Sequence, residues 1–202
     1  MTSSDGSPPA LRDALLRAAR EELDQAGGAP VSLRAVARRA GVSHAAPAYA
    51  FGDRSGLLTA VAAEGFAELA ALMDRPAPPG REGLAELGRR YTAFARDNPA
   101  LYEVMFSPGD LDDDDEALDA ARASSLRALT RLTRDDGADG PPGELTSIAW
   151  AFAHGVASLS TRGALPRATA EALVDGFAAL ADGRGAGPGH RGPQQRQPAA
   201  HR

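Results

Sequence analysis

Arginine side chains suited to binding phosphate are concentrated in residues 31–54 of this sequence. The segment holds four of them against a single acid, Asp53, whereas the whole chain has a formal net charge of −5. Guanidinium groups bind phosphate through charge-assisted hydrogen bonds, and a basic patch on an acidic protein is typical of a confined nucleic-acid contact. The four residues are Arg34, Arg38, Arg39 and Arg54. Because Arg38 and Arg39 are adjacent and face differently, we expect at least one of them to be solvated or in an ion pair.

Two short helices joined by a tight turn fit the same segment. Ser32 and Ser43 each precede a helical stretch and can cap it through the hydroxyl oxygen. The small Ala37 and the turn residue Gly41, four positions later, allow the two helices to cross closely. This is the geometry of a helix-turn-helix, whose second helix enters the major groove of DNA.

The sequence offers less support for catalysis or metal binding. It has no cysteine and only four histidines. The acidic run 110–116 places carboxylates at alternate positions, but Asp115 and Ala121 stand where an EF-hand needs glycine and glutamate. We interpret this run as a solvated loop. A helical-bundle enzyme using His154 and carboxylates as metal ligands remains a remote alternative, since the chain lacks a nucleophile-and-base arrangement. No catalytic residue, cofactor or metal ligand is predicted.

The composition favours an all-α fold. Hydrophobic residues make up 43% of the chain and aromatic residues only 5%, with many alanines, and alanine is the strongest helix former. No segment has the period-two alternation of a half-buried strand. We also find no apolar run of about 18 residues and no signal region at the N-terminus, so a cytoplasmic location is expected.

Proline- and glycine-rich breaks divide the helical pattern into separate units. The sequence RPAPPG at 75–80 cannot continue a helix and separates the first unit from the second. In the second unit we expect helices near 82–97, 99–106, 116–135, 144–162 and 168–182. The expected parts of the chain are a disordered arm (1–8), a three-helix domain with the helix-turn-helix (9–54), a connecting helix (55–75), a helical bundle (81–182) and a disordered basic tail (183–202).

These motifs resemble a known family. The segment LRDALLRAAREEL and then SLRAVARRAGVSHAAPAYAFGDRSGLLTAVAAEGF are similar to the DNA-binding domain of TetR-type transcriptional repressors, over roughly residues 10–73. The turn glycine, the capping serines and the Phe-Gly-Asp-Arg closure fall in register. Farther along, Trp150 and His154-Gly155 are similar to the Trp…His-Gly motif of the WHG-type C-terminal regulatory domain.

The resemblance implies a homodimer that binds a palindromic operator in double-stranded DNA. By position, Ser32 and Arg54 would bind phosphate, and Arg34 would reach phosphate or the minor groove. Ser43 and His44 would open the recognition helix toward the major groove, although a solvated His44 is the simpler alternative. The predicted DNA-binding set is Ser32, Arg34, Ser43, His44, Ala45, Tyr49 and Arg54.

The recognition helix departs from the family pattern in three places. Ala48 and Ala50 occupy positions where the family usually has tyrosine and histidine. Tyr49, between them, is the aromatic residue that could take over a phosphate or base contact. Pro47 replaces a large aliphatic residue, and we expect it to shorten or tighten the helix, since proline is tolerated near a helix start.

The second unit is expected to be a regulatory and dimerisation domain whose last two helices hold the dimer together. His154 lies one helical turn from Trp150 on the same face. Both residues could simply be part of the buried core. The alternative, which the resemblance favours, is that they line a pocket for a small apolar effector. Effector binding would release a repressor from DNA; a regulator without an effector, or an activator, is the competing interpretation. The predicted pocket comprises Tyr91, Phe94, Tyr102, Met105, Phe106, Trp150 and His154.

Overall fold

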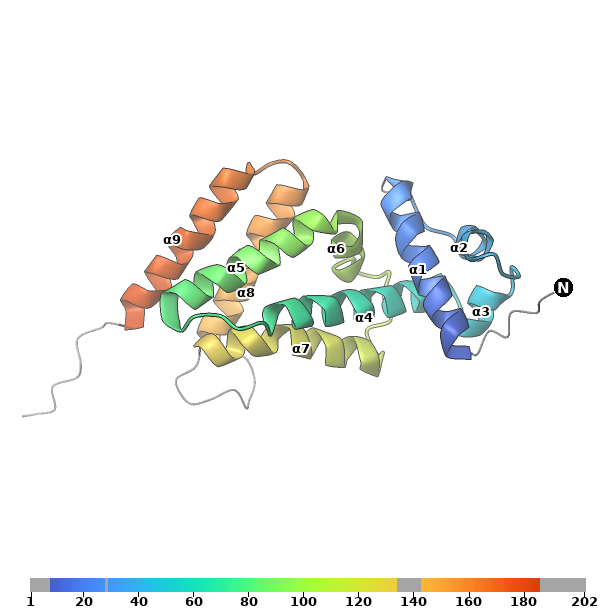
Figure 1. Cartoon of the computed structure of the whole chain (residues 1–202), viewed down its shortest axis with the longest axis horizontal. Helices are drawn as coiled ribbons and strands as arrows, with labels where there is room; N and C mark the ends of the chain where they lie inside the picture. Colours follow the sequence, from blue (N-terminus) through green and yellow to red (C-terminus); the bar gives the residue numbers. More distant parts are fainter. Residues whose placement is uncertain (1–7, 28, 134–142, 186–202) are drawn as a thin grey trace, which may run out of the picture.

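The computed structural model describes residues 8–27, 29–133 and 143–185, with side chains for residues 10–27, 29–133 and 143–181. Within these ranges the chain forms helices and no strand, which confirms the predicted all-α class. Figure 1 shows a small N-terminal helical unit at one end of α4 and a larger bundle around the rest of that helix. The helices are α1 (Pro8–Ala26), α2 (Leu33–Ala40), α3 (Ala46–Phe51), α4 (Arg54–Met73), α5 (Gly80–Asp97), α6 (Pro99–Met105), α7 (Glu116–Thr133), α8 (Glu144–Thr161) and α9 (Arg167–Gly185).

The first unit forms because α1 buries one apolar face against α2 and α4. Leu15, Leu16 and Ala19 are almost fully buried, at the helical spacing that puts them on one side of α1. The helix ends at Ala26 and is followed by Gly27 with a positive φ of 56°, a conformation that favours glycine. This packing fixes α2 against α1, and α3 in turn packs on α2 and α4 (Figure 1).

Helix α4 is the shared element of the two units. Its buried residues include Leu57, Leu58 and Val61 near the first unit and Phe66 and Leu69 farther along. It packs along α7 and α6, and its N-terminal end also contacts α1 and α3 (Figure 1). By length and composition α4 could cross a membrane, which the sequence analysis did not anticipate, but 56% of that window is buried inside the protein. We therefore describe α4 as a core helix.

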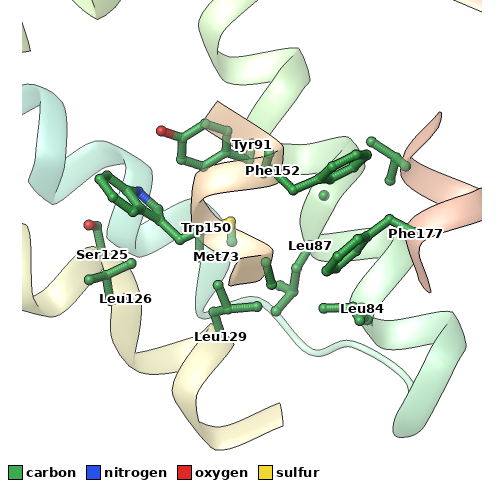
Figure 2. Close-up of a pocket in the computed structure, with 14 residues that line it drawn as sticks. Met73, Leu84, Leu87, Tyr91, Ser125, Leu126, Leu129, Trp150, Phe152 and Phe177 are labelled. Carbon is green, nitrogen blue, oxygen red and sulfur yellow. The ribbon is translucent and has the colours of Figure 1, made fainter. Parts of the chain in front are cut away.

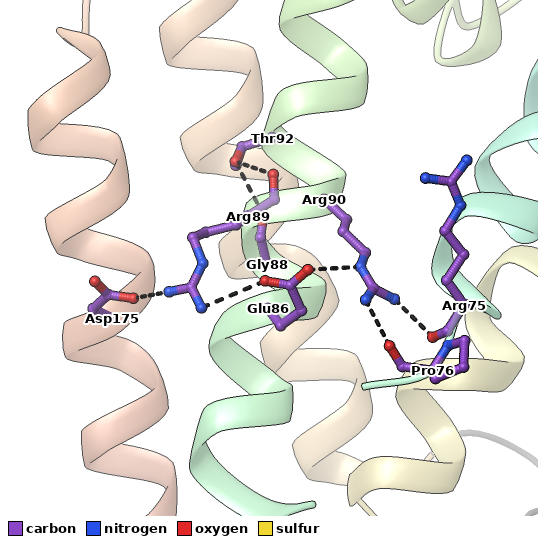
Figure 3. A network of polar contacts seen from close by, with 8 residues as sticks. All are labelled: Arg75, Pro76, Glu86, Gly88, Arg89, Arg90, Thr92 and Asp175. Atoms are coloured by element: carbon purple, nitrogen blue, oxygen red, sulfur yellow. Dashed lines mark hydrogen bonds and ion pairs between the residues drawn. The ribbon is translucent and has the colours of Figure 1, made fainter. Parts of the chain in front are cut away.

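Helix α5 is held to its neighbours by two adjacent arginines (Figure 3). Arg90 donates hydrogen bonds to the carbonyls of Arg75, at 2.7 Å, and Pro76, at 2.8 Å. Arg89 pairs with Asp175 on α9, and Glu86 accepts from Arg90 at 2.9 Å. These bonds fix the proline-rich connection after α4 and the position of α9 against α5.

The last two helices, α8 and α9, leave large apolar side chains on the surface. Phe152 and Phe177 stack between them, with ring centroids 4.6 Å apart. Other apolar residues of the pair point outward, and Leu180 is 72% exposed. The exposed set on these helices is Ile148, Trp150, Leu159, Leu173 and Leu180.

Several predicted boundaries shift in the structure. Pro8, assigned to the arm, is the first residue of α1, and residues 183–185, assigned to the tail, are the last turn of α9. The remainder of the predicted arm (1–7) and of the basic tail (186–202), with most of the loop after α7, lies outside the described residues.

Candidate DNA-binding and ligand-binding sites

The first helix of the motif, α2, begins as the sequence predicts. The Ser32 hydroxyl accepts a hydrogen bond from the backbone N–H of Ala35 at 3.2 Å, which satisfies one free donor at the helix start. Gly41 ends the helix with a φ of 69°. Ser32 and Arg34 are both exposed, so both are accessible to a ligand outside the protein.

The two adjacent arginines of α2 differ, as expected. Arg39 binds Glu22 at 2.7 Å and Gln25 at 2.6 Å, and therefore fastens α2 to α1. These hydrogen bonds to Glu22 and Glu21 raise the pKa of Arg39 above its usual value. Arg38 is exposed.

The recognition helix is short, as expected from Pro47, but the expected Ser43 cap is wrong. Helix α3 starts at Ala46, and its N-cap is Ala45, which makes no side-chain cap. The carbonyl of Ser43, rather than its hydroxyl, accepts a hydrogen bond from Ala46 N–H at 3.0 Å. Pro47 is buried in the first turn of α3. Backbone N–H groups in a first turn have no acceptor within the helix, so the missing N–H of proline costs no hydrogen bond there. Ser43 and His44 therefore precede the helix instead of opening it.

The outer surface of this segment is open to solvent. Tyr49 is 93% exposed, which is unusual for a large aromatic side chain in a folded protein. Ser43, His44 and Ala45 are exposed beside it in sequence. Six of the seven predicted DNA-binding residues are thus classed as exposed, and the seventh, Arg54, is half-buried.

Arg54 binds the second unit through a contact that the sequence does not predict. Its Nη1 lies 2.9 Å from Oδ1 of Asp110, in the segment between α6 and α7, and its Nε donates to the carbonyl of Val31 at 3.1 Å. The Ser55 hydroxyl donates to the carbonyl of Asp110 at 3.1 Å. Asp110 is the first residue of the acidic run 110–116, which we interpreted as a solvated loop. The N-terminal end of this loop therefore contacts α4 instead of being fully solvated. The pairing is distant in sequence, and no local pattern indicates it.

The turn between α3 and α4 requires close backbone packing. Asp53 caps α4 by accepting from the N–H of Gly56 at 2.9 Å. A Cβ atom on Gly56 would lie 2.1 Å from the carbonyl oxygen of Phe51, so this position has no room for a side chain. The Arg12 guanidinium lies 5.1 Å from the centre of the Phe51 ring and braces the end of α3 from α1.

The predicted pocket residues gather into an aromatic cluster centred on His154. The His154 Nδ1 lies 2.7 Å from the hydroxyl of Tyr102 and 3.2 Å from that of Tyr91. The rings of Phe106 and Trp150 lie 4.5 Å and 5.7 Å from the His154 ring, measured between centroids. Four of the seven predicted residues therefore contact a fifth, His154. The other two, Met105 and Phe94, are buried in the same hydrophobic core as Tyr91 and Tyr102.

Burial governs the ionisation of this cluster. It lowers the pKa of His154 and raises the pKa values of Tyr91 and Tyr102. The cluster is therefore neutral at neutral pH. With Nδ1 accepting from Tyr102, the hydrogen-bond pattern assigns the proton of neutral His154 to Nε2, which faces the Ser158 hydroxyl at 3.4 Å.

Three cavities adjoin the cluster, and no one of them is lined by all of the predicted residues. Figure 2 shows the innermost, among α5, α7, α8 and α9, lined by Tyr91 and Trp150 with many aliphatic side chains. Its volume is about 30 Å³, which is room for a water molecule and not for an effector. A cavity of about 440 Å³ on the other side of Trp150 is lined by Met105 and Phe106. A third, of about 570 Å³, has Tyr102 and His154 in its wall and reaches the end of α1.

The arrangement defines a helical protein with an exposed helix-turn-helix and a separate bundle that encloses cavities. Residues 15–61 match the family model "Bacterial regulatory proteins, tetR family", and residues 84–183 match "Tetracyclin repressor-like, C-terminal domain". The chain belongs to the tetR family of regulatory proteins.

Individual relatives agree with this assignment. The HTH-type transcriptional regulator BetI of Stenotrophomonas maltophilia is 32% identical over 108 residues, which cover 54% of this chain and 47% of the relative. BetI of Ectopseudomonas mendocina is 31% identical over 137 residues, 64% of this chain and 63% of the relative. The chain thus spans about half to three-fifths of these curated relatives. A solved structure of a protein of unknown function from Rhodococcus sp. RHA1 is 32% identical, with a TM-score of 0.73, and the match covers 92% of this chain and 98% of that one.

Proposed function

We propose that this protein is a sequence-specific DNA-binding transcriptional regulator that acts as a repressor in the cytoplasm. The observation that carries the proposal is the exposed surface of the helix-turn-helix, where Tyr49 is 93% exposed and supported by a folded scaffold. The exposed Tyr49 ring, with Ser43 and His44 exposed near it in sequence, offers hydrogen-bonding and aromatic groups of the kind that read base edges. Tyr49, His44 and Ser43 would contact base edges, while Ser32, Arg34 and Arg54 would bind phosphates. Ala45 would lie against the groove.

The protein would bind DNA as a homodimer through α8 and α9. In the described part of the chain these helices carry four exposed large aliphatic residues that a helix pair from a second copy could cover, Ile148, Leu159, Leu173 and Leu180, whereas Trp150 faces the aromatic cluster. A two-fold dimer presents two copies of α3 to a palindromic operator, with half-sites about one helical turn of DNA apart.

A small apolar effector would control the repressor through the aromatic cluster in a WHG-type regulatory domain. The supporting observations are the cluster around His154 and the cavities that adjoin it. A ligand that binds one conformation of the bundle more tightly than another shifts the spacing of the two α3 helices, and no covalent step is required. A regulator without an effector, or an activator, would share the same DNA-binding surface.

Selection of duplexes from a random DNA pool tests the proposal. The purified full-length protein is expected to enrich an inverted repeat, and titration by fluorescence anisotropy should give tighter binding to that repeat than to a scrambled duplex. Recovery of only unrelated sequences, with equal affinity for both duplexes, would contradict it.

A further inference from the structure

The cavity among α4, α6, α7 and α8 has a largely apolar lining, interrupted by Ser107, Ser125 and one ion pair. Its volume is about 440 Å³, within the range of small-molecule sites. The wall includes the rings of Phe66 and Phe106, which meet edge to face with centroids 5.3 Å apart. Met105, Leu126 and Trp150 complete the apolar lining. Such a wall suits a flat aromatic body.

Among the residues that line this cavity, one acid and one base are present, Asp113 and Arg122. The Arg122 guanidinium lies over the Phe66 ring, 5.9 Å from its centre, and Nη1 binds Asp113 Oδ1 at 3.0 Å. Arg122 also lies 3.7 Å from Asp119, so two carboxylates face one guanidinium. Asp119 does not line the cavity, so the negative charge in excess of Arg122 lies beside the mouth of the cavity rather than in its wall.

Arg122 is a cation that the rim of this cavity already holds. Its guanidinium is planar, contacts an aromatic face and binds a carboxylate at the rim, which is how a protein holds an organic cation. The Arg122 side chain is 33% exposed and Asp113 is 76% exposed, so both can turn out into solvent without leaving a buried charge unpaired.

We propose that this cavity binds an aromatic organic cation, whose ring lies against Phe66, Phe106 and Trp150 and whose charge replaces Arg122 on Asp113. The proposal rests on the proposed ligand response and changes its chemical class, from a neutral apolar effector to an aromatic one that carries a positive charge. Displacement of the guanidinium would also affect regulation, because Asp113 belongs to the same acidic segment that binds Arg54 through Asp110.

Three compounds that share a naphthalene ring and differ in charge test the proposal at neutral pH. These are 1-naphthylmethylamine, a cation, 1-naphthylmethanol, which is neutral, and 1-naphthoate, an anion. Calorimetric titration of the full-length protein without DNA is expected to give the tightest binding for the amine and the weakest for the carboxylate, by about tenfold overall. Equal affinity for the three compounds, no binding of the amine, or a preference for the carboxylate would each overturn the proposal.

Two substitutions of opposite sign locate the binding site. Asp113→Asn should weaken amine binding roughly three- to fivefold, as expected for a partly exposed ion pair, whereas Arg122→Gln should strengthen it by removing the internal competitor. Asp114→Asn is the matched control, since Asp114 is an exposed neighbour that does not line the cavity. If Arg122→Gln fails to fold, the proposal is tested by comparing the affinities of Asp113→Asn and Asp114→Asn for the amine. An equal loss of affinity in these two variants would overturn the proposal. The naphthalene titrations contain no DNA, so a negative result in them does not bear on whether the protein binds an operator. If the protein instead fails to bind an operator, its preference for the charged compound can still be measured.

Discussion

Arg54 and Asp110 join the two units of the protein through an ion pair with an N–O distance of 2.9 Å. Arg54 is the first residue of α4, directly after the helix-turn-helix, and Asp110 follows α6, which carries Tyr102 and Met105. The same segment is fastened a second time, because the N–H of Asp112 donates to the buried hydroxyl of Thr59 at 2.8 Å. The segment after α6 is therefore tied to the N-terminal part of α4, directly after the helix-turn-helix, by several polar contacts.

Removal of the Asp110 charge is expected to strengthen DNA binding. In the free protein the Asp110 carboxylate binds the Arg54 guanidinium, which is the group proposed to bind a DNA phosphate. Asp110→Asn should raise affinity for the selected operator by about two- to fivefold at low salt, the size of a partly exposed ion pair. Fluorescence anisotropy measures this change. Asp114→Asn removes the same charge without touching Arg54, so an equal gain in both variants would show that only the net charge matters.

Arg54 and Tyr49 should affect DNA binding in different ways. Arg54→Ala is expected to weaken binding to all sequences alike and to lower the slope of log affinity against log salt by about 0.9, since one phosphate contact is lost. Tyr49→Ala should change which base pairs are preferred and leave the slope nearly unchanged. Salt titrations and repeated selections distinguish the two effects. Arg127→Ala, at an exposed position on α7, serves as the control.

The turn between α3 and α4 should not tolerate a side chain at Gly56. In Gly56→Ala the new methyl group would lie 2.1 Å from the carbonyl oxygen of Phe51, so the backbone must move. We expect a loss of about 1–3 kcal/mol in the free energy of unfolding, in the range of overpacked sites. Gly176→Ala on α9 is the matched control, because a Cβ there meets nothing within 4 Å and helix propensity favours alanine. Urea denaturation measures both, and equal stabilities would contradict the packing described.

Acidification should destabilise the protein through His154. Burial lowers the pKa of His154 in the folded state below its ordinary value of 6.5, so the unfolded chain takes up the proton first. The free energy of unfolding should therefore be fully retained above pH 6.5 and fall as the pH decreases toward the folded pKa. His154→Asn keeps an acceptor for Tyr102 and should flatten this part of the profile. The exposed His44→Asn is the control, and a profile unchanged by His154→Asn would contradict the assignment.

Much of the fold follows from local sequence signals. Ser32, Gly41 and the proline-rich break at 75–80 mark helix ends through short-range chemistry, and the structure has helix ends at all three. The Ser43 cap failed because Pro47 fits best in the first turn, which moves the start of α3 to Ala46. The local sequence allows α3 to start either directly after Ser43 or at Ala46. The choice depends on how Pro47 packs against the core, which a local pattern does not contain.

The long-range contacts of the sites could not be predicted in this way. The Arg54–Asp110 pair depends on how α6 packs against α4, and a single sequence contains no signal for it. The aromatic cluster was predicted as one pocket, but close packing of the rings around His154 leaves the open space in separate cavities to either side. Identifying the residue types in a site is easier than locating the space between them.

Hydrogen–deuterium exchange of the full-length protein, with and without the selected duplex, tests the central claim most directly. Amide protection on DNA binding is expected in peptides covering residues 31–54, with the largest change around α3. Protection confined to α8 and α9 or to the C-terminal segment, with residues 31–54 unchanged, would contradict the assignment of the helix-turn-helix as the DNA-binding surface.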